Sequence, residues 1–100
     1  DYIISKSNVL VPAAPLLFDY NFDWSQVERF QLVQKSPGEI LILICLVDKE
    51  NDISDSILKR FEEMIGMDFK INVRVVKDIS YTSRGKYRYV QQNLNSHDYI

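Results

Sequence analysis

Three stretches of the chain have the apolar patterns that are typical of β-strands. Apolar and polar side chains alternate in residues 27–34 and again in residues 69–75, and residues 39–47 form a nearly continuous apolar run. Alternation predicts a strand with one buried face, whereas an unbroken run favours a central strand that is buried on both faces. The Ser-Pro-Gly turn at residues 36–38 is short enough to make the first two strands an antiparallel hairpin.

A helix is predicted between the second and third of these strands. Asp52 or Ser54 can cap its first turn, and Gly66 suits a left-handed stop at its end. The apolar residues that recur at helical spacing and fall on one face are Ile53, Ile57, Leu58, Phe61 and Ile65.

The N-terminal part of the chain predicts a small hairpin. Residues 2–4 and 9–11 have the composition of two short strands, and residues 6–8 form the turn between them. Pro12 and Pro15 are expected to end regular structure there, because proline lacks the backbone donor that a strand ladder needs.

The order of these elements predicts an α+β domain. It is expected to contain a small mixed sheet with one main helix packed on one face, preceded by a short N-terminal two-stranded hairpin. If residues 69–75 join residues 39–47, the two strands must be parallel, with the helix as their crossover. One hundred residues suffice for one domain and not for two, so residues 1–100 are assigned to a single domain.

The charge is unevenly distributed along the chain. The formal net charge is −2, yet residues 70–88 hold six basic side chains and one acidic side chain. This basic segment leaves one alternative open: a small interaction module that binds an acidic partner or RNA through its basic strand and loop. The negative net charge of the whole chain and the absence of a glycine-aromatic RNA-binding signature argue against a nucleic acid as the ligand.

The composition also narrows the candidate chemistry. Cys45 is the only cysteine and lies in an apolar strand, where it is expected to behave as a small core hydrophobe. His97 is the only histidine and lies in a polar tail, so no metal site is expected. The longest apolar run has eight residues and no N-terminal signal pattern is present. These features predict a cytoplasmic protein that does not enter a membrane.

Lys86 is the strongest candidate for chemistry. It follows Gly85, which allows a close backbone approach to an anion, in the run Thr82-Ser83-Arg84-Gly85-Lys86-Tyr87, and Arg88 comes next. In the functional interpretation it is a mobile cation that stabilises an anionic intermediate. The plainer alternative is a solvated lysine in a surface turn. Two interpretations are also open for Tyr81, Tyr87 and Tyr89. They could stack on the bases of a single-stranded nucleic acid, or they could pack on one face of a terminal strand.

Residues 79–88 resemble the C-terminal lysine motif of adenylate-forming enzymes, which typically reads Pro-Arg-Thr-x-Ser-Gly-Lys-x-x-Arg. Thr82, Gly85 and Lys86 match in place, and Arg88 falls at or beside the expected arginine. The positions that depart from the motif are Ser80, Tyr81 and Arg84.

The upstream sequence is similar to the same family. Residues 1–4 and 9–12 resemble the strand pair that follows the domain hinge. Residues 27–34, with the sequence VERFQLVQ, are similar to a strand of the phenylacetate–coenzyme A ligase-like branch, which includes proteins of capsular polysaccharide biosynthesis. The resemblance covers nearly the whole chain.

The resemblance implies a small, mobile C-terminal lid domain, excised from a two-domain ligase that activates a small carboxylic acid with ATP. Lys86 would be the catalytic lysine, and Thr82, Gly85 and Arg88 would shape the cofactor-binding loop. Asp1 would lie at the hinge. The partner would be the N-terminal adenylation domain of the same polypeptide, which binds ATP and its magnesium, and coenzyme A is one acceptor that the family allows. The 100-residue chain alone is expected to fold and to be inactive.

Overall fold

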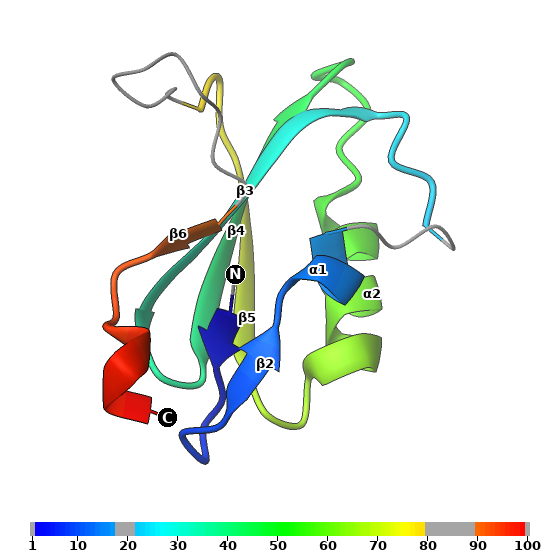
Figure 1. Ribbon diagram of the computed structural model, residues 1–100. Helices are drawn as coiled ribbons and strands as arrows, with labels where there is room; N and C mark the ends of the chain where they lie inside the picture. Colours follow the sequence, from blue (N-terminus) through cyan, green and yellow to red (C-terminus); the bar gives the residue numbers. More distant parts are fainter. Residues whose placement is uncertain (1, 18–21, 80–89, 100) are drawn as a thin grey trace.

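A four-stranded mixed sheet is the centre of the molecule, seen here in a computed structural model that describes residues 2–17, 22–79 and 90–99 (Figure 1). The strands are arranged in the order β5-β4-β3-β6. The central pair β3 and β4 is antiparallel, whereas β5 is parallel to β4 and β6 is parallel to β3. The bounds are β3 Val27–Ser36, β4 Glu39–Leu46, β5 Lys70–Val75 and β6 Val90–Gln92.

The register of the sheet separates a core face from an outer face. Leu32 lies opposite Ile42 on the core face, and Ile42 is also the partner of Val73. On the outer face Arg29 lies opposite Cys45. The predicted hairpin of β3 and β4 and the parallel crossover to β5 are both confirmed. The fold class is therefore α+β, as the sequence predicts.

The main helix, α2 (Ser54–Ile65), packs on the core face of the sheet through Ile57 and Phe61, which are fully buried. The prediction that Asp52 or Ser54 caps this helix is wrong, because the N-cap residue is Ile53 and no side chain of a described residue caps the helix. Asp52 lies one residue earlier, and its carboxylate accepts a hydrogen bond from the backbone N–H of Ser54 at 2.8 Å. The expected left-handed stop at Gly66 is wrong. Gly66 has φ −61° and ψ −20° and donates its N–H to the Glu62 carbonyl, because the chain continues in a right-handed turn before entering β5.

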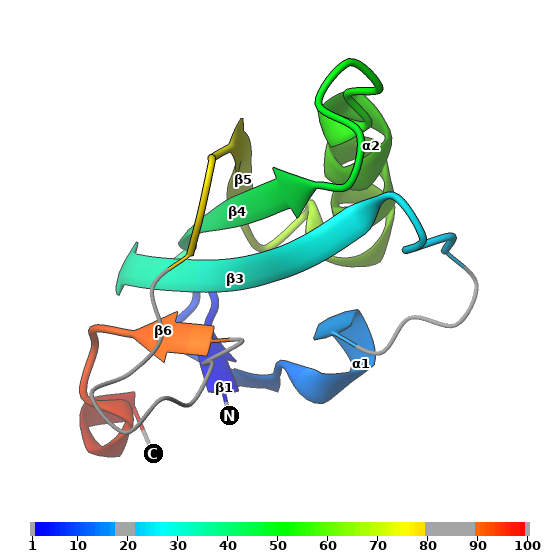
Figure 2. The ribbon, with the colours of Figure 1, turned by 90° about the horizontal axis from the view of Figure 1, so that it is seen from above.

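The predicted N-terminal hairpin is confirmed, and a short helix follows it. Strands β1 (Tyr2–Ile4) and β2 (Leu10–Pro12) pair in an antiparallel manner. Helix α1 spans Ala14–Leu17 and buries Leu16 in the core. The expectation that Pro15 ends regular structure is wrong, because the N–H groups of a helix's first turn have no intrahelical partner and a proline there loses no bond. Figure 2 shows α2, α1 and β1 on the same side of the sheet.

Buried hydrogen bonds attach the N-terminal hairpin to the sheet. Gln34 on β3 is fully buried, and its side-chain amide exchanges two hydrogen bonds of 2.8 Å with the backbone of Ile4. Gly38, in the turn between β3 and β4, has φ +74° and donates its N–H to the Ile4 carbonyl at 2.8 Å. A Cβ on Gly38 would lie 2.5 Å from Cγ of Lys6, so glycine serves both the turn and the close approach.

Two C-terminal elements are not foreseen by the sequence patterns. These are β6 and the 3-10 helix η1 (Ser96–Tyr99). None of the helices in the described part of the chain has the length and apolar character needed to cross a membrane.

Candidate functional site

The residues that the sequence singles out for chemistry lie outside the described residues. They are Lys86, Thr82, Gly85, Arg88 and Asp1. The structure does describe the chain on both sides of residues 80–89 and the strand to which both ends of that segment are attached. The candidate site is therefore built from these two attachments.

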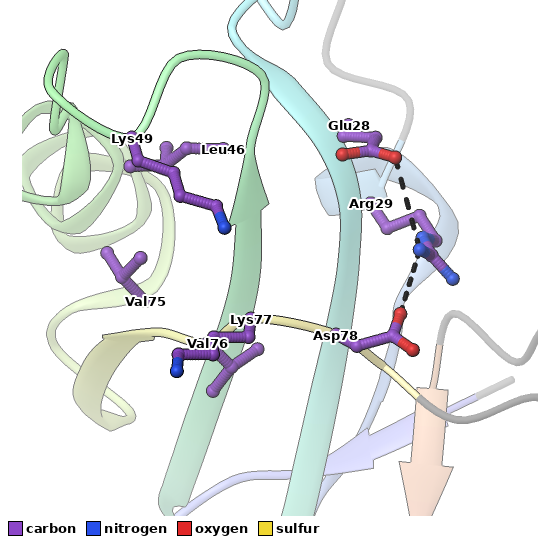
Figure 3. A pocket seen from close by; sticks show the side chains of 8 residues that line it. All are labelled: Glu28, Arg29, Leu46, Lys49, Val75, Val76, Lys77 and Asp78. Carbon is purple, nitrogen blue, oxygen red and sulfur yellow. Dashed lines mark ion pairs between the residues drawn. The ribbon is translucent and has the colours of Figure 1, made fainter.

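The first attachment joins Arg29 on β3 to the chain that follows β5. Residues 76–79 leave β5 and cross the outer face of the sheet, passing in front of β4 and β3 in Figure 3. Nη2 of Arg29 lies 2.8 Å from the Asp78 carboxylate, and Nη1 donates to the Ile79 carbonyl at 3.4 Å. Ile79 is buried, and its N–H donates to the Asp78 carboxylate at 2.9 Å. The chain is thus held in place immediately before residue 80.

The second attachment is β6, which begins immediately after residue 89. Val90 is the register partner of Leu32, and Gln92 is the partner of Gln34. Nε2 of Gln92 donates to Oε1 of Gln34 at 2.6 Å and to the Tyr2 carbonyl at 3.1 Å. The end of the segment is therefore connected both to β3 and to the N-terminal hairpin.

Both attachments lie close together on one strand. Arg29 and Leu32 are three residues apart on β3, a separation of roughly 10 Å along a strand. Residues 80–89 thus leave from and return to the same part of β3. The chain is thus fixed to a rigid base on both sides of residues 80–89, and proteins commonly position functional side chains from such a base. We call the Arg29–Asp78 pair and the Gln34–Gln92 pair together the loop frame.

The electrostatics at the first attachment are those of a partly exposed cation between two acids. Arg29 also lies 3.9 Å from Glu28, and the side chains of Glu28 and Asp78 are 59% and 69% exposed. Burial raises the pKa of the neighbouring Cys45 thiol, and Arg29 offsets this only in part. Cys45 is 2% exposed and stays a protonated thiol at neutral pH, which agrees with its expected role as a core residue.

A pocket of about 440 Å³ lies beside the crossing segment (Figure 3). The Arg29–Asp78 pair and Glu28 form one side of it. Lys49, from the loop after β4, lies on the opposite side, and Lys77 lies on the crossing segment. The apolar residues that complete the lining are Leu46, Val75 and Val76. Within the described residues, no group of three or more His, Cys, Asp or Glu side chains is arranged to hold a metal ion.

Sequence patterns do not identify the loop frame. Arg29 and Asp78 are 49 positions apart, and a charged residue in a strand is most simply interpreted as solvated. Gln34 does carry a signal, because it continues the core-facing series of Phe30 and Leu32. A polar side chain at an inward-facing position needs buried hydrogen-bond partners and so predicts a specific contact.

The fold and the site together define the class of protein. It is an α+β domain in which a short N-terminal hairpin packs on a mixed sheet. The family model for the CapK C-terminal domain matches residues 16–93, and the chain belongs to this family. The family name connects the domain with an enzyme of capsular polysaccharide biosynthesis. The match confirms the resemblance to a C-terminal domain of that branch, and it includes residues 80–89. No curated protein matches the chain significantly.

Proposed function

We propose that this chain is the lid domain of an adenylate-forming ligase and that Lys86 is its catalytic cation. In this proposal residues 1–100 are one domain at the C-terminal end of a longer polypeptide. The large domain of that polypeptide binds ATP, its magnesium ion and a small carboxylic acid. The lid domain then brings Lys86 to the carboxylate and phosphate groups, where a positioned positive charge stabilises the developing negative charge.

The observation that carries the proposal is the loop frame in a chain of the CapK C-terminal domain family. A catalytic group must be held within a fraction of an ångström of its productive position to be effective. Lys86 lies between Ile79 and Val90 in the sequence, and these two residues are attached to β3 through Arg29 and Leu32. Within residues 80–89, Thr82, Gly85 and Arg88 are proposed to shape the surface that meets the nucleotide.

The contacts of the hairpin agree with a hinge at Asp1. Ile4 is bonded to Gln34 and Gly38, and the N–H of Lys6 donates to the Asp68 carbonyl at 3.1 Å. The hairpin therefore belongs to the same rigid unit as the sheet and α2. A rotation of this domain against a large domain would have to take place before Tyr2, which is where the family resemblance locates the hinge.

The charge of β5 offers some support to the alternative function, an interaction module for an acidic partner or RNA. Lys70 and Arg74 are exposed on this edge strand. However, Glu39 is the register partner of Lys70 and lowers the positive potential there. Binding of single-stranded RNA to the 100-residue chain, titrated with salt, distinguishes the two functions, because a true RNA binder loses affinity steeply as salt rises. The ligase proposal predicts no such binding.

Removal of the domain tests the proposal. The full-length polypeptide and a form that ends before residue 1 are compared in carboxylate-dependent exchange of pyrophosphate into ATP. Truncation should reduce the exchange at least about a hundredfold, because one major source of transition-state charge stabilisation is lost. A full-length Lys70→Ala variant, which removes a cation outside the loop, is the control and should retain normal exchange. Full activity of the truncated form would overturn the proposal.

A further inference from the structure

We infer that the pocket between Lys49 and Lys77 binds an organic phosphate, with the phosphate between the two ammonium groups and the adjoining carbon chain on the apolar lining. None of the residues that line this site belongs to residues 80–89, and the inference does not depend on the ligase proposal. It rests on the composition of the pocket, on its two lysines and on the net positive charge of its lining.

The pocket has the size and the mixed lining of a small-molecule site. Its volume of about 440 Å³ falls within the usual range for ligand pockets, roughly 300–1,000 Å³. Val75 is 39% exposed, although valine is an apolar residue on a strand, and it lines the pocket together with Val76 and Leu46. These side chains offer an apolar surface to a hydrocarbon segment.

The two lysines supply the charge that a phosphate needs. Lys49 and Lys77 come from different elements, are exposed, and form no ion pair with another described residue. The acids of the pocket are committed elsewhere: Asp78 lies 2.8 Å from Arg29, and Glu28 lies 3.9 Å from the same guanidinium. The lining holds three basic side chains, those of Arg29, Lys49 and Lys77, and two acidic ones, so its net charge is +1. Lysine ammonium groups are common phosphate ligands in proteins.

The position of the pocket gives its ligand a contact with the loop frame. Lys77 precedes Asp78, which pairs with Arg29, and Val76 donates its N–H to the Ile44 carbonyl at 2.8 Å. A phosphate at Lys77 therefore lies against a segment that is fixed at both ends. The ligand binds to a formed surface and does not have to order the chain, which lowers the entropic cost of binding.

Nitrogen-15 NMR titration of the 100-residue chain at constant ionic strength tests the inference, with inorganic phosphate and n-butyl phosphate as probes. Both probes should shift the amide signals of Lys49, Val76 and Lys77 in a saturable way. Butyl phosphate should bind about fourfold more tightly, the gain expected from burying about one methylene group. Lys49→Gln and Lys77→Gln should each weaken binding about fivefold, which corresponds to the loss of one exposed ion pair.

Lys70→Gln is the matched control, because it removes the same charge from the other end of β5 and should leave both affinities unchanged. If all three substitutions weakened binding equally, the effect would come from the net charge of the chain and not from the pocket, and the inference would be overturned. Shifts confined to residues 80–89, or shifts that do not saturate, would overturn it as well. Equal affinity for the two probes would contradict an organic ligand.

Discussion

The side-chain amide of Gln34 forms a closed pair of hydrogen bonds with the backbone of Ile4. Oε1 accepts from the Ile4 N–H and Nε2 donates to the Ile4 carbonyl, each at 2.8 Å. The geometry is that of two strands that exchange backbone hydrogen bonds, but here the buried side chain of Gln34 takes the place of one backbone. It joins the N-terminal hairpin to β3 and, through Gln92, to the end of residues 80–89.

Replacement of Gln34 by leucine should lower the free energy of unfolding by about 1–3 kcal/mol, the cost of leaving one buried polar group without a partner. That group is the N–H of Ile4, since its carbonyl keeps the bond from Gly38 and Gln92 keeps its bond to Tyr2. Urea denaturation of the 100-residue chain measures the change. Gln91→Leu, an exposed neighbour on β6, is the control and should change stability little. Equal effects of the two substitutions would argue against the role assigned to Gln34.

The Arg29–Asp78 pair should contribute modestly to stability. A double-mutant cycle with Arg29→Met and Asp78→Ala should give a coupling energy of about 0.5–1 kcal/mol, because the pair is well formed at 2.8 Å but Asp78 is 69% exposed. Hydrogen exchange at the Ile79 amide, which donates to Asp78, should accelerate in the Asp78→Ala variant. A coupling of zero together with unchanged exchange would mean that this pair does not hold the crossing segment.

The fold could be predicted from the sequence wherever a pattern is long and local. The apolar run of β4, the alternation in β5 and the periodicity of α2 each extend over several residues, so the burial of one face dominates the outcome. Gly66 shows the limit, since glycine permits a left-handed stop but does not require one. The path into β5 decides that the helix ends in a right-handed turn.

The attachments of the loop could not be predicted in the same way. Strand β6 has three residues and pairs with β3, 58 positions away at Val90 and Leu32, so its local sequence carries almost no periodic signal. The contact of Arg29 with Asp78 likewise depends on the sheet being formed first. What the sequence can predict is a candidate for the chemistry, because the glycine–lysine pair at residues 85–86 is contiguous; these residues lie outside the described ones, so Lys86 stays a prediction.

The hydrogen bond between Asp52 and Ser54 at the start of α2 makes a small part of the stability dependent on pH. The hydrogen bonds from Ser54 lower the pKa of the Asp52 carboxyl below its ordinary value of 3.8. The folded pKa is the lower one, so this stabilisation is complete above 3.8 and disappears as the pH falls through the folded value. Asp52→Ala should therefore lower stability at pH 7, by roughly half a kcal/mol at this exposed position. The difference should become smaller as the pH falls below 3.8, and urea denaturation at pH 7 and at a series of lower pH values checks this. A difference that is independent of pH would contradict a stabilising role for the ionised Asp52 carboxylate.

Exchange of pyrophosphate into ATP by the full-length polypeptide carrying Lys86→Ala tests the central claim most directly. The account predicts that exchange falls by several orders of magnitude, on the scale of a lost transition-state charge contact. Thermal unfolding should be unchanged, because the substitution leaves the loop frame intact. Lys70→Ala, which removes a cation outside both the loop frame and the pocket, should keep normal exchange. Near-normal exchange by the Lys86→Ala enzyme would contradict the claim that this domain supplies the catalytic lysine.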